Sequence, residues 1–168
     1  DELKKLLIDS YITSKNYKEA LDLLENNKNF ADKAAYQKVA FYRGLEVYTD
    51  GKYQDAYTLF KKSLTENKDA KITARATFWK GECEYSLDQF SEAVLTYKQF
   101  LNNASASETP ENKTVNYNLA YSYFKIKEYE NAIPYFNTYI TNSKEDKNRL
   151  TDAYLRLADC NYISSKYW

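Results

Sequence analysis

The side chains in this sequence that could do chemistry are mostly tyrosines and carboxylates. The 168 residues include 18 tyrosines and 24 aspartates and glutamates, but only two cysteines and no histidine. Histidine is the commonest metal ligand and a frequent general base, so its absence removes the usual catalytic and metal-binding group. There is also no phosphate-binding glycine loop of the GxxxxGK or GxGxxG type. These residue types favour binding through aromatic rings, and we expect neither enzyme activity nor a cofactor.

The formal charges of the chain balance, with 24 lysines and arginines against 24 acidic residues. Nucleic-acid binding depends largely on a basic face, so we expect no nucleic-acid partner. A chain without net positive charge is also poorly suited to an anionic membrane surface, and we expect no direct membrane insertion. Proteins, peptides and glycans are the partners that this composition leaves to consider.

A short motif recurs along the chain at a nearly fixed spacing. An aromatic residue followed three residues later by alanine begins at Tyr17, Tyr53, Phe90 and Tyr129, and a fifth copy is cut short at Tyr167. The spacings are 36, 37, 39 and 38 residues (53−17, 90−53, 129−90, 167−129). Self-similarity at such a period is typical of proteins that stack small units into an array. The sequence therefore predicts a repeat protein.

Most units also carry a small residue nine positions before the aromatic. With the aromatic counted as position 17, position 8 is Ile8, Gly44, Gly81, Ala120 and Ala158, and position 20 is Ala20, Ala56, Ala93 and Ala132. Two of the three glycines in the chain lie at position 8. Glycine within a helix costs about 1 kcal/mol relative to alanine. We therefore expect close helix contact there, between position 8 and position 20.

The segments around these positions have the periodicity of helices. Tyr117, Tyr121 and Phe124 recur at spacings of four and three residues, as on one face of a helix. We expect each helix pair to turn at position 15, which Gly51 occupies in the second unit. Helices are predicted at 2–14, 17–29, 33–50, 53–66, 70–87, 90–103, 110–127, 129–142 and 147–164.

This pattern resembles the tetratricopeptide repeat. That family has a small residue at position 8, an aromatic at 17, alanine at 20 and a large residue at 24, and the unit with Ala120, Tyr129, Ala132 and Phe136 is similar to it. The family's usual proline at position 32 is missing, and the units exceed its period of about 34 residues. The resemblance implies an all-α fold, an α-solenoid of antiparallel helix pairs that coil into a right-handed superhelix.

We interpret residues 1–168 as a single domain of about four and a half repeats. Their limits fall near 1–32, 33–69, 70–108, 109–146 and 147–168, of which the last is truncated. The chain begins without methionine and stops early in a second helix, so we expect a fragment of a longer repeat array. Tyr167 and Trp168 would then be exposed aromatics, and self-association through this end is expected.

One stretch of the third unit resembles a narrower group. The letters FWKGE at 78–82, followed by Tyr85, are similar to a line in bacterial envelope repeat proteins, such as the periplasmic partner of the Tol–Pal system. This resemblance implies a location in the periplasm or cell envelope, with the cytoplasm as the alternative.

By resemblance to the family, positions 5, 9 and 12 of the first helices line a concave groove. These positions supply an aromatic ladder with two acids set into it: Phe41, Tyr48, Phe78, Glu82, Tyr85, Tyr117, Tyr121, Phe124, Asp159 and Tyr162. Aromatic side chains give large contact area at low entropic cost and are frequent binding anchors. We predict a protein–protein interaction scaffold that docks a peptide or partner protein in this groove. A competing interpretation is that position 5 and part of position 12 pack between neighbouring first helices.

Two other functions stay open at this point. Exposed tyrosines are also stacking platforms for sugars, so the chain is alternatively an envelope glycan- or peptidoglycan-binding module. The third hypothesis is a structural spacer within a larger repeat protein, with a tyrosine excess that reflects an AT-rich genome. A spacer requires Tyr48, Tyr85 and Tyr121 to be mostly buried, whereas a glycan site requires coplanar exposed rings.

The two cysteines and the longest inter-helix segment give smaller predictions. Cys83 and Cys160 lie at position 10 of units two apart, too far for a disulfide, which needs Cα atoms within about 7 Å. We predict two free thiols that act as small packing residues. The small polar residues and proline of 102–111 predict a surface loop, with Thr109 as the cap of the following helix and Pro110 at its first position.

Overall fold

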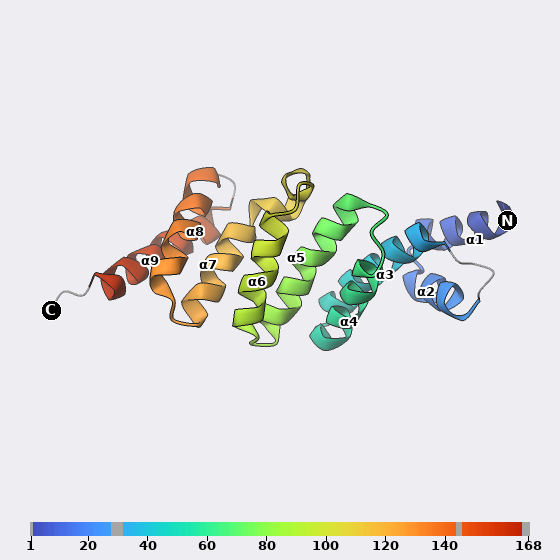
Figure 1. Ribbon diagram of the computed structural model, residues 1–168, viewed down its shortest axis with the longest axis horizontal. Helices are drawn as coiled ribbons and strands as arrows, with labels where there is room; N and C mark the ends of the chain where they lie inside the picture. Colours follow the sequence, from blue (N-terminus) through green and yellow to red (C-terminus); the bar gives the residue numbers. More distant parts are fainter. Residues whose placement is uncertain (1, 28–31, 144–145, 166–168) are drawn as a thin grey trace.

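The computed structural model describes residues 2–27, 32–143 and 146–165. Over these ranges the chain forms nine α-helices and two short 3-10 helices: α1 (Glu2–Thr13), α2 (Tyr17–Asn26), α3 (Lys33–Thr49), α4 (Tyr53–Leu64), α5 (Ala70–Ser86), α6 (Phe90–Leu101), η2 (Ala106–Glu108), η3 (Pro110–Lys113), α7 (Val115–Lys125), α8 (Tyr129–Asn142) and α9 (Lys147–Ser164). They follow one another along the long axis, from α1 at one end to α9 at the other (Figure 1). Consecutive α-helices pack as antiparallel pairs, which confirms the predicted all-α solenoid.

The turn inside each helix pair uses the same backbone conformation four times. Position 15 has left-handed φ angles at Lys15 (59°), Gly51 (76°), Asp88 (59°) and Lys127 (64°). In each turn the backbone N–H of position 15 donates to the carbonyl three residues earlier, as Gly51 does to Tyr48. The N–H of position 16 donates to the carbonyl five residues earlier, as Lys52 does to Val47. This pair of bonds is the Schellman motif, which satisfies carbonyls left over at a helix end. The predicted turn at position 15 is confirmed.

Three of the first helices begin at an aspartate that caps them. Asp32, Asp69 and Asp146 each accept backbone N–H bonds from residues two or three positions on, at 2.9–3.0 Å. Such a cap satisfies N–H groups that have no partner inside the helix, typically stabilising it by about 1 kcal/mol. Helix starts and turns are therefore specified locally in most units.

The glycines at position 8 make room for large rings. A Cβ atom added to Gly44 would lie 2.7 Å from the Phe60 ring, and one added to Gly81 would lie 2.9 Å from the Tyr97 ring. Phe60 and Tyr97 occupy position 24 of the second helix and are 0% exposed. The residue nearest to the glycine at position 8 is therefore the ring at position 24. The sequence suggests the alanine at position 20, but only a long side chain spans the gap between the two helices.

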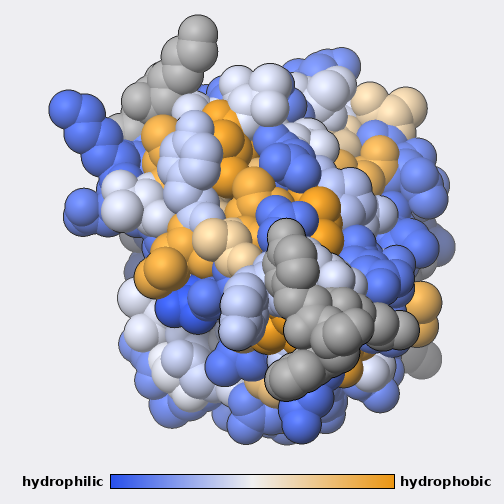
Figure 2. Space-filling view, turned by 90° about the vertical axis from the view of Figure 1, so that its left-hand side faces the viewer, coloured by the Kyte–Doolittle hydropathy of each residue, from blue (hydrophilic) through white to orange (hydrophobic). Residues whose placement is uncertain are grey.

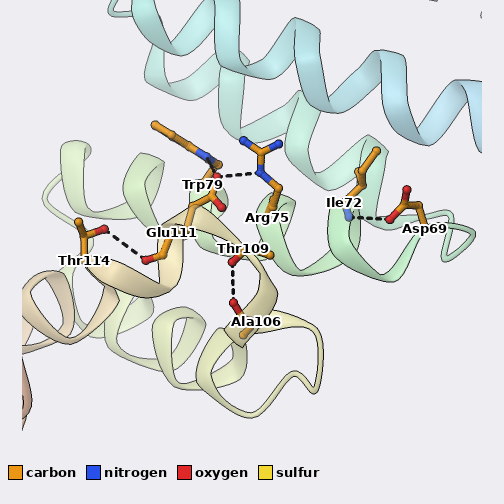
Figure 3. Close-up of polar contacts among 8 residues, drawn as sticks. All are labelled: Asp69, Ile72, Arg75, Trp79, Ala106, Thr109, Glu111 and Thr114. Atoms are coloured by element: carbon orange, nitrogen blue, oxygen red, sulfur yellow. Dashed lines mark hydrogen bonds and ion pairs between the residues drawn. The ribbon is translucent and has the colours of Figure 1, made fainter. Parts of the chain in front are cut away.

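The segment between α6 and α7 is more ordered than the predicted surface loop. It contains η2 and η3 and buries Ala106, Thr109 and Glu111. The Thr109 hydroxyl donates to the Ala106 carbonyl at 2.7 Å and makes no capping bond (Figure 3). The predicted Thr109 cap is wrong because the loop itself uses this hydroxyl. The predicted helix at 110–127 begins as a 3-10 turn at Pro110, and α7 starts at Val115.

Glu111 fastens this segment to α5. Its Oε1 atom accepts hydrogen bonds from the Arg75 guanidinium and the Trp79 indole, both at 2.9 Å (Figure 3). The Glu111 side chain is only 5% exposed, and the guanidinium lies 4.8 Å from the centroid of the Phe41 ring. A hydrogen-bonded ion pair of this kind is strong when both partners are shielded from water. These contacts hold the segment between α6 and α7, which we call the insert, against α5 of the third unit.

Both cysteines are packing residues, as predicted. Cys83 and Cys160 are free thiols, and each is 0% exposed. Burial raises the pKa of Cys83 to about 12 and that of Cys160 to about 11. Because the thiolate is the reactive form, these thiols are chemically quiet at neutral pH.

Both ends of the described array expose apolar side chains. At the two ends, the exposed large hydrophobic residues are Leu3, Leu6 and Leu7 on α1, and Tyr154, Leu155, Tyr162 and Ile163 on α9. Figure 2 looks onto the α9 end, where hydrophobic residues lie grouped among hydrophilic ones. Tyr167 and Trp168, which the sequence predicts to be exposed at this end, lie outside the described residues.

Candidate functional site

Several predicted groove residues converge on one hollow between α5 and α7. It has a volume of about 160 Å³ and is lined by Glu82 and Tyr85 of α5, Tyr97 of α6, and Tyr117, Asn118 and Tyr121 of α7. Four of these were predicted as groove residues from sequence alone: Glu82, Tyr85, Tyr117 and Tyr121. We call this cavity the Glu82 hollow.

Helix geometry explains why these side chains meet. Glu82 and Tyr85 are three residues apart on α5, while Tyr117 and Tyr121 are four apart on α7, so each pair shares one helix face. The absence of a side chain at Gly81 leaves space for the Tyr97 ring, which comes from α6. The hollow is therefore a product of two consecutive units rather than of one helix pair.

Glu82 supplies the carboxylate of the hollow. Its Oε1 atom accepts hydrogen bonds from the Tyr97 hydroxyl and from the Asn118 amide, which ties α5 to α7. Burial raises the pKa of Glu82 above its ordinary value, while these two bonds and the charge of Arg149 lower it. Burial dominates because the charged form loses its hydration. Among the ion pairs of the described ranges, none includes Glu82.

Asp152 of α9 holds the two tyrosines of α7. The Tyr117 hydroxyl donates to Asp152 Oδ2 at 2.7 Å, and the Tyr121 hydroxyl donates to the same atom. The two ring centroids are 4.9 Å apart, with the ring planes at 52°. Burial and the bond to Asp152 raise the pKa of Tyr121 to about 12 and raise that of Tyr117 as well. Both phenols therefore stay protonated at neutral pH, and the rings are held in place.

Two arginines of α9 lie over neighbouring rings. Arg149 is 5.2 Å from the centroid of Tyr117, and Arg156 is 5.6 Å from the centroid of Phe124. Arg156 also pairs with Asp159 at 2.6 Å, so the predicted groove acid Asp159 has a cation partner. Contacts between a cation and a ring contribute roughly 0.5–1 kcal/mol at exposed sites.

Two of the predicted groove residues lie in the core. Phe41 is 0% exposed and Phe78 is 3% exposed. Phe41 packs 6.0 Å from Phe60, and Phe78 packs 5.5 Å from Phe100, measured between ring centroids. Phe41 and Phe78 are therefore buried rather than in a groove. These ring contacts are with the second helix of the same unit, not with the neighbouring first helix of the competing interpretation.

Three further predicted residues carry aromatic rings outside the lining of the Glu82 hollow. Tyr48 on α3 is half-buried, lies 5.1 Å from Trp79, and has its hydroxyl 3.2 Å from Ser86 Oγ. Phe124 is half-buried on α7, 6.1 Å from the Tyr121 ring, and Tyr162 is 77% exposed on α9. We use the name aromatic groove for the predicted surface that Tyr48, Tyr85, Tyr121, Phe124 and Tyr162 would form.

Sequence reasoning missed three residues of the site. Tyr97 could have been found from the sequence. It lies at position 24, where Phe60 and Phe136 in the neighbouring units are also aromatic and buried. Asn118 and Asp152 had none, since their partners Glu82 and Tyr121 are 36 and 31 residues away. No local pattern records contacts over such separations.

A larger hollow of about 560 Å³ lies where η3, the end of α8 and the start of α9 meet. Its lining includes Asn112, Asn116, Asn142 and Arg149 but none of the predicted groove residues.

Over the described ranges, no group of three or more histidine, cysteine, aspartate or glutamate side chains could hold a metal ion. Within the same part of the chain, no helix is long and apolar enough to cross a membrane.

The comparisons with known proteins agree with this architecture. A model of the tetratricopeptide repeat family matches residues 41–108 and 89–147. Together these matches cover 41–147, which is 107 residues (147−41+1) of the 168. A search of proteins with curated functions finds no match.

Similar solved structures are repeat proteins as well. A mutant of MamA superposes with a TM-score of 0.67 at 18% identity, over 99% of this chain and 86% of that one. TPR-like repeats from Podosopora anserina, named for kinesin light chain, give 0.64 at 14% identity, over 99% of this chain and 87% of that one. The RS-1 double mutant of MamA gives 0.61 at 15% identity, over 97% of this chain and 95% of that one. Identities this low establish the fold alone. Neither these structures nor the family match supports the closer resemblance to the Tol–Pal partner.

Proposed function

This chain belongs to the tetratricopeptide repeat family, and from that premise we propose that it is a non-enzymatic scaffold that binds a peptide or partner protein in the aromatic groove. Domains of this family generally bind protein partners, and the family match is not to an enzyme family. The observation that carries the proposal is the recurrence of half-buried rings on α3, α5 and α7, at Tyr48, Tyr85, Tyr121 and Phe124. Rings held rigidly but still accessible are the usual anchors of protein interfaces.

The tilt of these rings supports a peptide groove over a sugar platform, whereas their burial does not separate a groove from a spacer. A spacer requires Tyr48, Tyr85 and Tyr121 to be mostly buried, and each of these side chains is more covered than exposed. A sugar platform needs coplanar exposed rings, yet Tyr121 is tilted by 53° to Phe124 and by 52° to Tyr117. Tilted rings suit side chains that insert between them better than a flat sugar face.

A peptide selection tests the proposal. We would select a displayed random peptide library on the immobilised chain and measure each selected peptide against wild type and Tyr85→Ala. The expected result is at least a tenfold loss of affinity in Tyr85→Ala, because truncating an anchor ring typically costs 2 kcal/mol or more. The matched control is Tyr57→Ala, since Tyr57 is a half-buried ring on α4, outside the groove.

The alternatives give different results in the same experiment. Peptides that bind wild type and Tyr85→Ala equally would contradict the groove. A failure to select any peptide would favour the spacer, and a glycan array would then test the peptidoglycan alternative.

A location in the periplasm or cell envelope remains part of the proposal, supported by the resemblance at 78–82. Trp79 and Gly81 in that stretch also have packing roles in this fold, since Trp79 bonds to Glu111 and Gly81 admits the Tyr97 ring. Fractionation of the source cells distinguishes the envelope from the cytoplasm, because the protein is expected in the periplasmic fraction.

A further inference from the structure

Three shielded carboxylates lie on or against α5, and only two of them have a cation partner. Glu111 pairs with Arg75 at 2.9 Å, and Glu84 pairs with Lys80 at 2.5 Å. Glu82 lines the hollow and belongs to none of the ion pairs found among the described residues. Shielding a carboxylate from water is costly unless a cation or hydrogen bonds compensate it.

The nearby arginines are occupied by other carboxylates. Arg149, whose charge acts to lower the pKa of Glu82, pairs with Asp146 at 3.7 Å. Arg156 pairs with Asp159 at 2.6 Å. Two hydrogen bonds, from Tyr97 and Asn118, both go to a single oxygen of Glu82, Oε1. The hollow therefore has an acidic group with no cation of this chain in contact.

The walls of the hollow suit a cation as well. Tyr85, Tyr117 and Tyr121 contribute rings to its lining, and the face of an aromatic ring attracts positive charge. The hydroxyls of Tyr117 and Tyr121 donate to Asp152, which holds both rings in place. Asp152 itself pairs with Arg156 at 3.7 Å, and Arg149 lies 5.2 Å from the Tyr117 ring, so Glu82 is the carboxylate of the hollow without a cation in contact. Rings beside a carboxylate are the arrangement that proteins use to bind ammonium groups.

The size of the hollow is compatible with the end of a long cationic side chain. Its volume is about 160 Å³. A lysine side chain is unbranched and ends in a compact ammonium group that can approach a single carboxylate between rings, whereas the planar guanidinium of arginine is larger by two non-hydrogen atoms. We therefore choose lysine as the occupant to be tested.

We propose that the Glu82 hollow binds the ammonium group of a lysine side chain, carried by the peptide that occupies the aromatic groove. The inference deepens the proposed scaffold function and rests on it. Glu82 supplies the opposite charge, and Tyr85, Tyr117 and Tyr121 enclose the methylene chain and the ammonium.

A small-molecule titration tests the hollow by itself. We would add n-butylammonium chloride to the ¹⁵N-labelled chain and follow its amide resonances by NMR, with sodium chloride, n-butanol and sodium butyrate as comparison solutes. The expected result is saturable shifts of α5 and α7 amides with butylammonium, and at least tenfold weaker binding of n-butanol, which has the same chain without the charge.

Two variants and one control identify the groups responsible. Glu82→Gln removes the charge but keeps an oxygen for the bonds from Tyr97 and Asn118, so it should fold and bind butylammonium at least tenfold more weakly. Tyr85→Leu keeps an apolar wall without a ring and should also weaken binding. Glu92→Gln removes an exposed charge on α6, outside the hollow, and should leave binding unchanged.

The results separate this inference from the scaffold proposal. Equal binding of butylammonium and n-butanol, or unchanged affinity in Glu82→Gln, would overturn it. Selected peptides that depend on Tyr85 but contain no lysine would overturn the lysine site and leave the scaffold standing. Butylammonium binding without any selected peptide would leave the ammonium site and remove the scaffold. Selection of arginine in place of lysine would overturn the choice of side chain.

Discussion

At the scale of single residues, Glu82 and Glu111 show how neighbours assign different roles to one side-chain type. Glu111 has an arginine and an indole as donors and joins the insert to α5. Glu82 has a tyrosine and an asparagine as donors and lacks a cation in contact. Removing one partner of a buried pair leaves the other charge uncompensated, whereas a carboxylate without a cation is already held at some cost and is available to a ligand.

Glu82→Gln is predicted to raise the melting temperature at pH 7. Burial raises the pKa of Glu82 in the folded state, so the folded protein binds this proton more tightly than the unfolded chain does. The favourable contribution of this group is therefore present below the ordinary glutamate pKa and is lost as pH rises through the folded value. The charge of Arg149 and the donors Tyr97 and Asn118 limit the effect but do not reverse it.

Thermal unfolding of both proteins at pH 7 and at about pH 3.5, below the ordinary glutamate pKa, measures this difference. The gain from Glu82→Gln should shrink in acid, because the wild-type side chain is then neutral in both states. A wild type that is the more stable protein at pH 7 would contradict the prediction.

Glu111→Ala is predicted to destabilise the chain by about 2–3 kcal/mol, the range for losing hydrogen bonds to a charged group. It leaves the Arg75 guanidinium over the Phe41 ring without its carboxylate and the Trp79 indole without its acceptor. Urea unfolding followed by circular dichroism measures the change.

The matched control for this prediction is Glu108→Ala, on the same insert. Glu108 pairs with Lys71 at 2.8 Å, but both side chains are about 60% exposed, at 58% and 60%. Water screens an exposed pair, so no measurable change is expected. Equal effects of the two substitutions would show that Glu111 is not buried as described.

At the scale of the elements, the four Schellman turns explain why the helix pairs form where they do. Each turn places position 15 in the left-handed region, yet only Gly51 is a glycine. The other three turns hold Lys15, Asp88 and Lys127 there, in a conformation that disfavours a Cβ atom. The local hydrogen bonds of the turn form at these positions too, and the packing of the helices on both sides offsets the cost of the backbone conformation.

Replacing Lys127 by glycine is predicted to stabilise the chain by about 0.5–1 kcal/mol, because glycine adopts a positive φ without steric penalty.

The reverse change, Gly51→Ala, should destabilise the chain by about 1 kcal/mol. Apart from its chain neighbours, no residue comes within 4 Å of a Cβ added at Gly51, so this effect is one of backbone conformation. Urea unfolding of both variants checks the signs, and a stabilising Gly51→Ala would exclude the conformational explanation.

At the scale of the whole molecule, the array has two apolar ends at opposite ends of its long axis. α1 exposes Leu3, Leu6 and Leu7, and α9 exposes Tyr154, Leu155, Tyr162 and Ile163. These two helices lie at the two ends of the array (Figure 1). In a stacked-repeat protein each unit covers the apolar face of its neighbour. Unlike faces at opposite ends suit head-to-tail contact between copies of the chain.

We predict weak end-to-end self-association that Leu155→Glu abolishes, because the new carboxylate would have to be buried in the contact. Sedimentation velocity at increasing protein concentration measures it. Leu95→Glu is the matched control, since Leu95 is 69% exposed on α6, away from both ends. A sedimentation coefficient that does not rise with concentration in the wild type would rule out the association.

Sequence alone determined the architecture of this protein. The aromatic spacing of 36–39 residues, the helical periodicity and the turn at position 15 each predicted structure that the fold confirms. These signals are readable because helix faces, caps and turns depend on residues only a few positions apart. The resemblance to the tetratricopeptide repeat, which assigns positions 5, 9 and 12 to a groove, singled out Tyr85, Tyr117 and Tyr121, which line the hollow.

Only the tertiary structure decided which of those residues form a site. Phe41 and Phe78 have the same repeat position as Tyr117, yet they are buried while Tyr117 lines the hollow. The hydrogen bond from Asn118 to Glu82 joins residues 36 positions apart, on helices of two different units. The physical reason is that the burial and the electrostatic surroundings of a side chain depend on how neighbouring units stack. The residue pattern within one unit does not show which residues of the next unit it will contact.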